Sequence, residues 1–219
     1  MSVDVQLVPI GSVRPSAYNP RVTDPTRLDL IATSLQKLGF VLPIYADANG
    51  EILSGHQRHM AAERLGFTHI PVVFTKPMAL EQRRNVNVVF NRATNDMQPN
   101  STPQKLVETL ESSGVDDLAA VLPDKTGDAR FPCLQVETVP LADMVEANQG
   151  AWIEYARNIT KLLADRGILM PVIATRDRKV VNGIGRVHYL AEQQAETIDV
   201  VFITDAEAAF ARVMLNLLS

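Results

Sequence analysis

Several residue types on which function often depends are scarce or missing in this chain. Cys133 is the one cysteine, so an internal disulfide and a cysteine-based zinc cluster are excluded. The four histidines are too scattered to indicate a metal site. No apolar run reaches the ~18 residues that cross a bilayer, and the N-terminus lacks the basic-then-apolar layout of a secretory signal. We therefore expect a cytoplasmic protein with no membrane partner and no metal site built by its own side chains.

The composition is that of an ordinary globular protein. Hydrophobic residues make up 46% of the 219 residues and charged residues 21%, and this length favours two small domains. The net charge of −4 is unevenly divided, because residues 1–95 carry ten Lys and Arg against seven Asp and Glu. The net charge of the first half therefore favours binding of a phosphate-bearing ligand more than that of the second half does.

An internal repeat governs the organisation of the chain. Residues 33–90 can be laid without gaps on residues 161–218, at a constant offset of 128, with eleven identities among the 58 pairs. The identities include the two residues of a Gly-x-x-Arg pattern, which are Gly55 and Arg58 in the first copy and Gly183 and Arg186 in the second. A repeat of this length predicts that one supersecondary unit occurs twice.

The matching positions predict the same order of elements in both copies. A helix ends at a glycine, a short strand starts beside a proline, and a turn leads to a second strand, the Gly-x-x-Arg pattern, a helix, an apolar strand and a closing helix. An additional strand is expected to open each copy, because QLVPI at 6–10 resembles ETVPL at 137–141. The closing helices are predicted over 78–91 and 205–218.

The segment between the copies reads as a linker. Residues 95–104 are polar and proline-rich, residues 101–122 are predicted to be helical, and residues 123–133 form a second loop. The predicted domains are therefore 1–94, a linker with one or two helices over 95–133, and 134–219. The predicted fold class is α+β, with two small mixed sheets flanked by helices.

The stretch Ser54-Gly55-His56-Gln57-Arg58 carries the most chemical information. A strand runs into a glycine and a helix begins at once, so unpaired amide N–H groups at the helix start attract an anion. Gly55 lets a ligand approach the backbone, and Arg58 offers a planar charged fork to phosphate oxygens. The alternative is a plain strand-to-helix turn with a surface arginine.

A family resemblance supports the phosphate interpretation. Asn19-Pro20-Arg21, KLGFVLPI at 37–44, SGHQRHMAAERLG at 54–66 and IPVVF at 70–74 together resemble the N-terminal domain of the ParB/sulfiredoxin superfamily, over about residues 5–92. The nearest variety looks like the ParB-like domains found beside phage and plasmid DNA-modification enzymes. The resemblance implies that the turn holds the phosphates of CTP or ATP, and that residues 136–218 are a degenerate second copy of the domain.

The resemblance carries over residue by residue. Partition-type ParB proteins have Gly-Glu-Arg-Arg at the turn, and here His56 and Gln57 replace the middle pair, so the loss of the acidic residue puts a magnesium site in doubt. Sulfiredoxins have their nucleophilic cysteine at the position of His56, which excludes thiol chemistry. The implied nucleotide-binding residues are Ser54, Gly55, His56, Gln57, Arg58, Asn19, Arg21 and Asn91.

Two acidic residues are candidates for a general base if the protein transfers a phosphoryl group, as kinase members of the superfamily do. Glu51 can instead be a strand-edge charge, and Asp24 can instead be the N-cap of a helix that begins at Pro25. In the second copy, Gly183 and Arg186 keep the pattern in acidic surroundings, so we interpret it as a structural copy, with a weaker second site as the alternative.

Three functions compete on this evidence. The leading one is a ParB-like module that binds CTP or ATP, as a ligand or as a slowly hydrolysed switch, and works with DNA or a DNA-modification protein, as a monomer or a homodimer. The second is an ATP-dependent phosphotransferase acting on a small molecule or a modified base. The third is a DNA-binding or structural adaptor whose two turns are vestigial. Nuclease activity is not expected, because no carboxylate cluster is present to hold metals.

Overall fold

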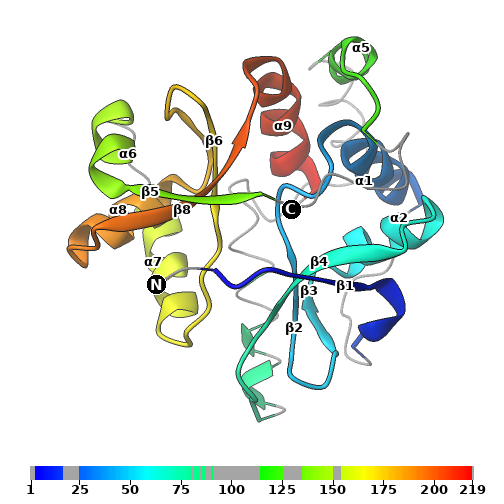
Figure 1. Ribbon diagram of the computed structural model, residues 1–219, viewed down its shortest axis with the longest axis horizontal. Helices are drawn as coiled ribbons and strands as arrows, with labels where there is room; N and C mark the ends of the chain where they lie inside the picture. The colour runs from blue at the N-terminus through cyan, green and yellow to red at the C-terminus, as the bar shows by residue number, and fades with distance from the viewer. Residues whose placement is uncertain are drawn as a thin grey trace.

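Two four-stranded mixed sheets form the framework of the protein in a computed structural model (Figure 1). Helices α1 and α2 lie on the outer side of the first sheet, and α6, α7 and α8 lie on the outer side of the second. Helix α9 lies between the two halves, close to α1. The structure describes residues 3–16, 25–79, 81–83, 85–86, 90, 114–125, 135–149 and 154–218.

Among the described residues, the first half has a short 3-10 turn and the helices α1 and α2 around its sheet, and residues 81–83, 85–86 and 90 are also helical. Its strands have the spatial order β1-β4-β2-β3, with β4 antiparallel to β1 and parallel to β2. The elements in chain order are β1 (Gln6–Pro9), η1 (Ile10–Ser12), α1 (Pro25–Leu38), β2 (Ile44–Ala46), β3 (Ile52–Ser54), α2 (His56–Arg64) and β4 (His69–Phe74).

The second half repeats this arrangement with one addition. Its strands have the order β5-β8-β6-β7, with the same directions. After the connecting helix α5 (Val115–Val121), its elements are β5 (Val136–Pro140), α6 (Leu141–Ala147), α7 (Glu154–Ala164), β6 (Val172–Thr175), β7 (Val180–Asn182), α8 (Ile184–Glu192), β8 (Thr197–Ile203) and α9 (Asp205–Leu218). Helix α6 stands where the first half has only the 3-10 turn, and the sequence analysis did not predict it.

The strand registers of the two halves coincide at the offset found in the sequence. Ile44 pairs with Val72 in the first sheet, and Val172 pairs with Val200 in the second. Each sheet also has a register shift at one place, after Tyr45 in β2 and after Ile173 in β6. A bulge is a local backbone feature that leaves one residue unpaired, so its recurrence means that the two sheets share fine backbone geometry as well as topology.

Left-handed backbone conformations recur at the same offset. Positive φ values occur at 39 and 167, 50 and 178, 55 and 183, and 66 and 194. At two of these positions the second half has a residue other than glycine, because Arg178 (φ 70°) replaces Gly50 and Gln194 (φ 54°) replaces Gly66. A non-glycine residue adopts this conformation only at a cost. The turn geometry has therefore been kept where its most permissive residue has been replaced.

One face of each sheet packs against helices of its own half. Successive side chains of a strand point to opposite faces, so Ile44 and Ala46 of β2 lie in a core with Ile31 of α1 and Ala61 of α2. In the second sheet, Val172 lies in the corresponding core with residues of α6 and α8. This alternation is the arrangement expected for a mixed sheet with one helical layer.

The opposite faces belong to a core that both halves share. Tyr45 of β2 and Ile173 of β6, both fully buried, lie in one apolar cluster. Helix α9 contributes four buried residues to it, Ala208, Phe210, Ala211 and Met214, while also contacting α1 of the first half. The shared core therefore joins the two halves into one body.

A buried hydrogen bond crosses between the halves inside this core. The Tyr45 hydroxyl donates to the Leu169 carbonyl at 2.8 Å. Burial raises the pKa of Tyr45 strongly, although the positive charges of Arg186 and Arg58 oppose the shift. Because arginines from both halves act on one hydroxyl, the two Gly-x-x-Arg turns face the same central region.

Residues 122–125 fasten the connecting segment to both halves. The Lys125 N–H donates to the Gln36 carbonyl at 2.7 Å, and the Lys125 ammonium forms an ion pair with Glu207 at the start of α9. Glu207 also accepts the Thr204 N–H at 2.8 Å while its own N–H donates to the Thr204 hydroxyl, which is a capping box. The sequence analysis predicted a loop over 123–133, and its described part docks on the protein at Lys125.

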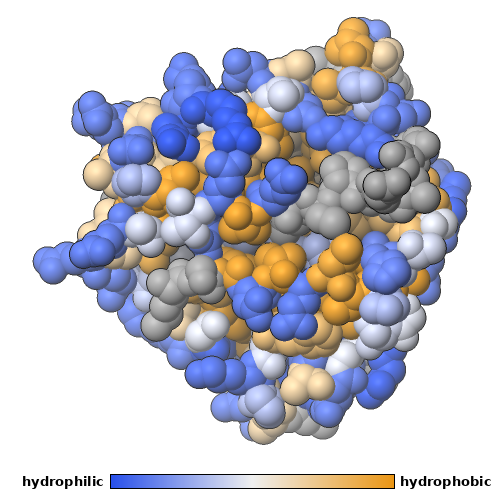
Figure 2. Space-filling model, in the orientation of Figure 1, coloured by the Kyte–Doolittle hydropathy of each residue, from blue (hydrophilic) through white to orange (hydrophobic). Residues whose placement is uncertain are grey.

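The surface seen in Figure 2 is mostly hydrophilic, with hydrophobic side chains gathered near the centre of the view. Leu7 of β1 is one exposed apolar residue, at 52% of its maximal accessibility. Within the described residues, every helix is too short or too polar to cross a bilayer.

Replacing Tyr45 with phenylalanine tests the hydrogen bond between the halves. The variant leaves the Leu169 carbonyl without its donor, so we expect the free energy of unfolding to fall by about 1–3 kcal/mol. Urea denaturation of Tyr45→Phe and of Tyr189→Phe, a tyrosine with no such bond in the described structure, gives the comparison. Equal effects of the two substitutions would contradict the assignment.

The pH dependence of stability tests the contact at Glu207. Burial alone would raise the pKa of Glu207, but the Lys125 ammonium and the Thr204 groups hold it below its ordinary value. A lowered pKa in the folded state adds stability above the ordinary glutamate pKa, and this stability is lost as the pH falls through the folded value. We expect Lys125→Met to reduce the loss of stability on acidification, measured by thermal unfolding between pH 3 and 7.

Lys161→Met is the matched control, since Lys161 pairs with Asp165 on the exposed face of α7. A surface pair of this kind contributes little. If the control flattened the pH dependence as much as Lys125→Met, the role of Glu207 would be rejected.

Candidate functional site

The candidate site is the turn between β3 and α2. Gly55 lies there in a left-handed conformation, with φ 98° and ψ 18°, as the N-cap of α2. No side chain caps this helix, which is nine residues long. A helix start without a side-chain cap offers amide N–H groups and the positive end of the helix dipole to an anion.

Glycine is required at this position for two reasons. The first is its left-handed conformation, which side chains disfavour. The second is space, because a Cβ atom at Gly55 would lie 3.0 Å from Ile44 Cγ1 and 3.3 Å from Arg58 Nη2. The turn therefore brings the backbone, β2 and the Arg58 guanidinium into direct contact.

Arg58 folds back over the turn toward the first half's own backbone. Its Nη1 donates to the carbonyls of Leu42, at 2.5 Å, and Pro43, at 2.9 Å. Its Nη2 lies beside Gly55 and makes no hydrogen bond within the described part of the chain. Arg58 Nη1 thus connects the segment before β2 to the start of α2, and Arg58 Nη2 lies beside Gly55.

Burial lowers the pKa of Arg58 to about 10, while Tyr45 raises it slightly. The guanidinium therefore stays protonated near neutral pH, and its positive charge lies in a partly desolvated place. Charge in such a place interacts more strongly with an anion than charge on an open surface does.

The other predicted residues of the turn are buried. Ser54 ends β3, and both His56 and Gln57 lie in the first turn of α2. His56 Nε2 accepts a hydrogen bond from the Ser16 N–H at 3.3 Å. His56 therefore connects Ser16 to the start of α2.

Glu51 is engaged in an ion-pair network. Its carboxylate accepts hydrogen bonds from the Ser16 hydroxyl at 2.6 Å and from Arg83 Nη1 at 2.6 Å. Arg83 also pairs with the buried Asp47 at 3.0 Å, and Asp47 accepts the N–H groups of Asn49 and Glu51. Asp47 and Arg83, which sequence reasoning missed, thus organise the β2–β3 turn together with Glu51.

Four predicted residues lie outside the described part of the chain. They are Asn19, Arg21, Asp24 and Asn91. Cys133 also lies outside it. The structure therefore brings together Ser54 to Arg58 and places Glu51 in a network with Asp47 and Arg83 that Ser16 connects to His56.

The second turn differs from the first in how its arginine is used. Gly183 has nearly the same conformation as Gly55, with φ 103° and ψ 24°. Arg186 is buried, with 8% exposure, and its Nη1 donates to the Pro171 carbonyl while its Nη2 donates to Asn182 Oδ1 at 2.6 Å. Both groups of this guanidinium therefore have protein partners.

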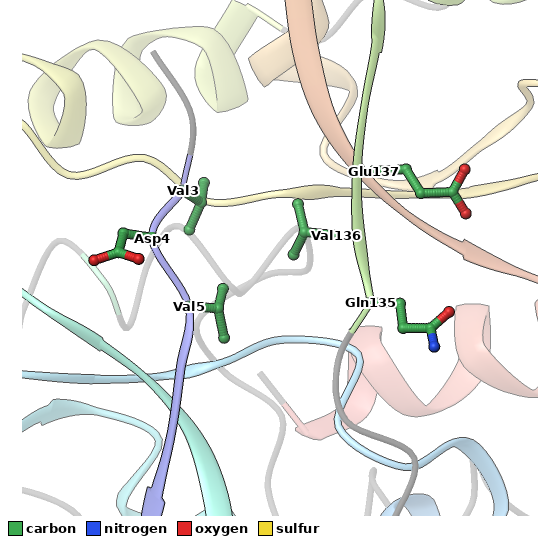
Figure 3. Close-up of a pocket in the computed structure, with 6 residues that line it drawn as sticks. All are labelled: Val3, Asp4, Val5, Gln135, Val136 and Glu137. Carbon is green, nitrogen blue, oxygen red and sulfur yellow. The ribbon is translucent and has the colours of Figure 1, made fainter.

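A shallow groove lies elsewhere, between the N-terminal segment and the start of β5 (Figure 3). It is lined by Val3, Asp4, Val5, Gln135, Val136 and Glu137. Its charged groups are acidic, and no motif in the sequence indicated it. In the described residues, no group of three or more His, Cys, Asp or Glu side chains is arranged to hold a metal ion.

Comparisons with known proteins match the first half of the chain to a family. Residues 1–92 match the ParB N-terminal domain family. The chain is 31% identical over 86 residues to the ParB-like nuclease domain-containing protein YnaK of Escherichia coli K12, covering 38% of this chain and 99% of that protein. It is 35% identical over 75 residues to the nucleoid occlusion protein of Bacillus cereus strain B4264, covering 32% of this chain and 26% of that protein. The chain thus spans about a quarter of the length of the nucleoid occlusion protein.

Two solved structures are similar at low sequence identity. One is the C-terminally truncated chromosome-partitioning protein ParB from Caulobacter crescentus complexed with CTP-gamma-S, with a TM-score of 0.39 and 19% identity, covering 51% of this chain and 62% of that one. The other is a Pnob8-like ParB-N domain, with a TM-score of 0.38 and 17% identity, covering 54% and 47%.

Alanine substitutions at two left-handed glycines test the crowding at the turn. Gly66 has φ 79° but open space around its Cβ position, so Gly66→Ala should cost about 1–2 kcal/mol from its backbone conformation alone. Gly55→Ala should cost about 2–4 kcal/mol, because the new methyl also presses on Ile44. Chemical denaturation measures both. A loss at Gly55 no larger than that at Gly66 would contradict the close packing.

Proposed function

Because this chain belongs, through residues 1–92, to the ParB N-terminal domain family, we propose that its first half binds a nucleoside triphosphate, CTP or ATP. The phosphates lie at the Gly55 turn, where the start of α2 supplies amide N–H groups and Arg58 supplies the positive charge. The observation that carries the proposal is the position of Arg58 Nη2, which lies beside the left-handed glycine at the uncapped start of α2.

The neighbouring residues have distinct roles in this proposal. Ser54 ends the strand before the glycine, and the His56 and Gln57 backbones provide the first-turn amides. Asn19, Arg21 and Asn91 are further contacts implied by the family resemblance. A magnesium ion accompanies the triphosphate through phosphate oxygens, since His56 stands where partition-type ParB proteins have a glutamate.

We further propose that the second half is a diverged duplicate of the first, with domains at 1–94 and 134–219 joined by a linker at 95–133. The identical strand order, the coincident bulges and the four left-handed positions at one offset support this proposal. Packing of the two halves through the sheet faces of the shared core gives each copy the cover that a second subunit would supply.

In the cell, the module acts as a nucleotide-dependent, slowly hydrolysing switch in DNA partition, regulation or modification. The names of its relatives, which include nucleoid occlusion proteins, support a role beside DNA in the cytoplasm. DNA or a DNA-modification protein is the partner. Phosphotransfer to a small molecule or modified base is less favoured, because Glu51 is already paired with Arg83 and Ser16.

Calorimetric titration with CTP, ATP, GTP and UTP in the presence of magnesium tests the proposal. We expect one of the triphosphates to bind the wild type, and Arg58→Ala to weaken this binding about ten- to a hundredfold, because a charge-assisted contact is lost. Arg64→Ala is the control, since Arg64 lies at the far end of α2 in an exposed pair with Asp29.

Arg58 also holds the Leu42 and Pro43 carbonyls, so Arg58→Lys is measured in parallel with thermal unfolding of each variant. Lysine keeps the charge without the planar fork. Binding by none of the four nucleotides would reject the proposal and leave a structural or DNA-binding adaptor. Transfer of a labelled γ-phosphate to an acceptor rather than to water would identify a phosphotransferase.

A further inference from the structure

The two Gly-x-x-Arg turns are nearly superposable in backbone conformation yet differ at the residue before the glycine. That residue is Ser54 in the first half and Asn182 in the second, at the offset of 128. Each is the last residue of its strand and is buried, with 9% exposure for Ser54 and 5% for Asn182. The side chains therefore start from equivalent places next to equivalent arginines.

In the second half, Asn182 is hydrogen-bonded to Arg186 of the same turn. Asn182 Oδ1 accepts a hydrogen bond from Arg186 Nη2 at 2.6 Å, and the Pro171 carbonyl accepts one from Nη1. The guanidinium is drawn so close over the turn that a Cβ at Gly183 would lie 2.6 Å from Arg186 Nη2. Arg186 Nη2, the nitrogen that faces the turn, is thus already hydrogen-bonded to an amide oxygen.

In the first half, the corresponding nitrogen has no such partner. The Nη1 of Arg58 holds the Leu42 and Pro43 carbonyls, as Arg186 holds the Pro171 carbonyl. The Ser54 hydroxyl makes no hydrogen bond within the described residues, and Arg58 Nη2 lies 3.3 Å from the Cβ position of Gly55. A serine side chain ends one bond beyond Cβ, so it lacks the reach of an asparagine amide.

We propose that the residue before the glycine decides which turn accepts a phosphate. Asn182 closes the second turn by supplying an internal oxygen to Arg186, whereas Ser54 leaves Arg58 Nη2 for an oxygen of an outside triphosphate. Ser54 is thereby a specificity-determining residue of the first turn. The inference rests on the proposed binding of a nucleotide at that turn. On this inference, the two turns share one backbone geometry but only the turn at Gly55 binds a phosphate.

The net charge of the two parts of the chain acts in the same direction. Residues 96–219 contain 11 basic and 18 acidic residues, whereas residues 1–95 contain ten and seven. A neutral amide oxygen satisfies Arg186 without bringing an anion into the more acidic half. The first half, with its net positive charge, tolerates the phosphates that Arg58 attracts.

Exchange of the two residues tests the inference. We expect Ser54→Asn to weaken the binding of MgCTP or MgATP, whichever the wild type binds, about ten- to a hundredfold, because the new amide competes for Arg58 Nη2. Ser12→Asn, the same exchange at an exposed serine of η1, should bind within about threefold of the wild type, because the Ser12 hydroxyl bonds the Pro9 carbonyl on the surface and not the turn. Asn182→Ser should raise the calorimetric stoichiometry from one to two. Wild-type affinity in Ser54→Asn, or an equal loss in Ser12→Asn, would overturn the inference.

A ligand-free measurement separates this inference from the proposed function. The guanidinium protons of Arg186 should exchange slowly with water in nuclear magnetic resonance spectra of the full chain. Ser54→Asn should slow the exchange of the Nη2 protons of Arg58, and Asn182→Ser should speed the exchange of the Nη2 protons of Arg186, while the Nη1 protons of both arginines stay bonded to carbonyls. If neither change occurs, the inference fails even where nucleotide binds. If both changes occur but the wild type binds no nucleotide, the proposed function fails, while the closure of the second turn by the hydrogen bond between Asn182 and Arg186 is confirmed.

Discussion

One face of each sheet packs on helices of its own half and the other face lies in a core that both halves share, and the need to cover this second face governs the rest of the structure. Tyr45 and Ile173 lie at equivalent positions on these second faces and are buried in one common core. Helix α9 completes the core by lying on its own sheet while contacting α1 of the first half. A small mixed sheet exposed on one apolar face is poorly stable in water, so the two halves depend on each other for cover.

The shared core also sets the position of the candidate site. Arg58 and Arg186 both lie near enough to the Tyr45 hydroxyl to affect its pKa, so the two arginine turns point toward the middle of the molecule. Burial there lowers the pKa of Arg58 to about 10 without discharging it at neutral pH. The turn therefore combines a fixed charge, a bare glycine and an uncapped helix start in a partly desolvated place, which is the physical basis of anion binding in many nucleotide-binding proteins.

The two turns further illustrate how a repeated backbone can carry different chemistry. The φ values of Gly55 and Gly183 differ by only a few degrees, and both arginines donate to the carbonyl of the proline directly before β2 or β6. These contacts hold the segment before β2 or β6 to the start of a helix and are structural in both halves. What differs is a single polar atom, Asn182 Oδ1, on the remaining nitrogen of Arg186. Structural and ligand-binding roles of one arginine are therefore compatible, since each uses a different part of the planar fork.

Local interactions made much of this protein predictable from its sequence. Glycines at left-handed turns, alternating apolar strands and the offset of 128 act over a few residues at a time, so the strands, α2, α8, α9 and the Gly55 turn were all expected. The resemblance to the ParB family over about residues 5–92 could be found in the sequence for the same reason. Tertiary structure alone decided the Tyr45 bond to Leu169, the engagement of Glu51 by Arg83, helix α6 and the different partners of Arg58 and Arg186. Those contacts join residues distant in the chain or depend on the direction of a single side chain, which no local pattern of residue types encodes.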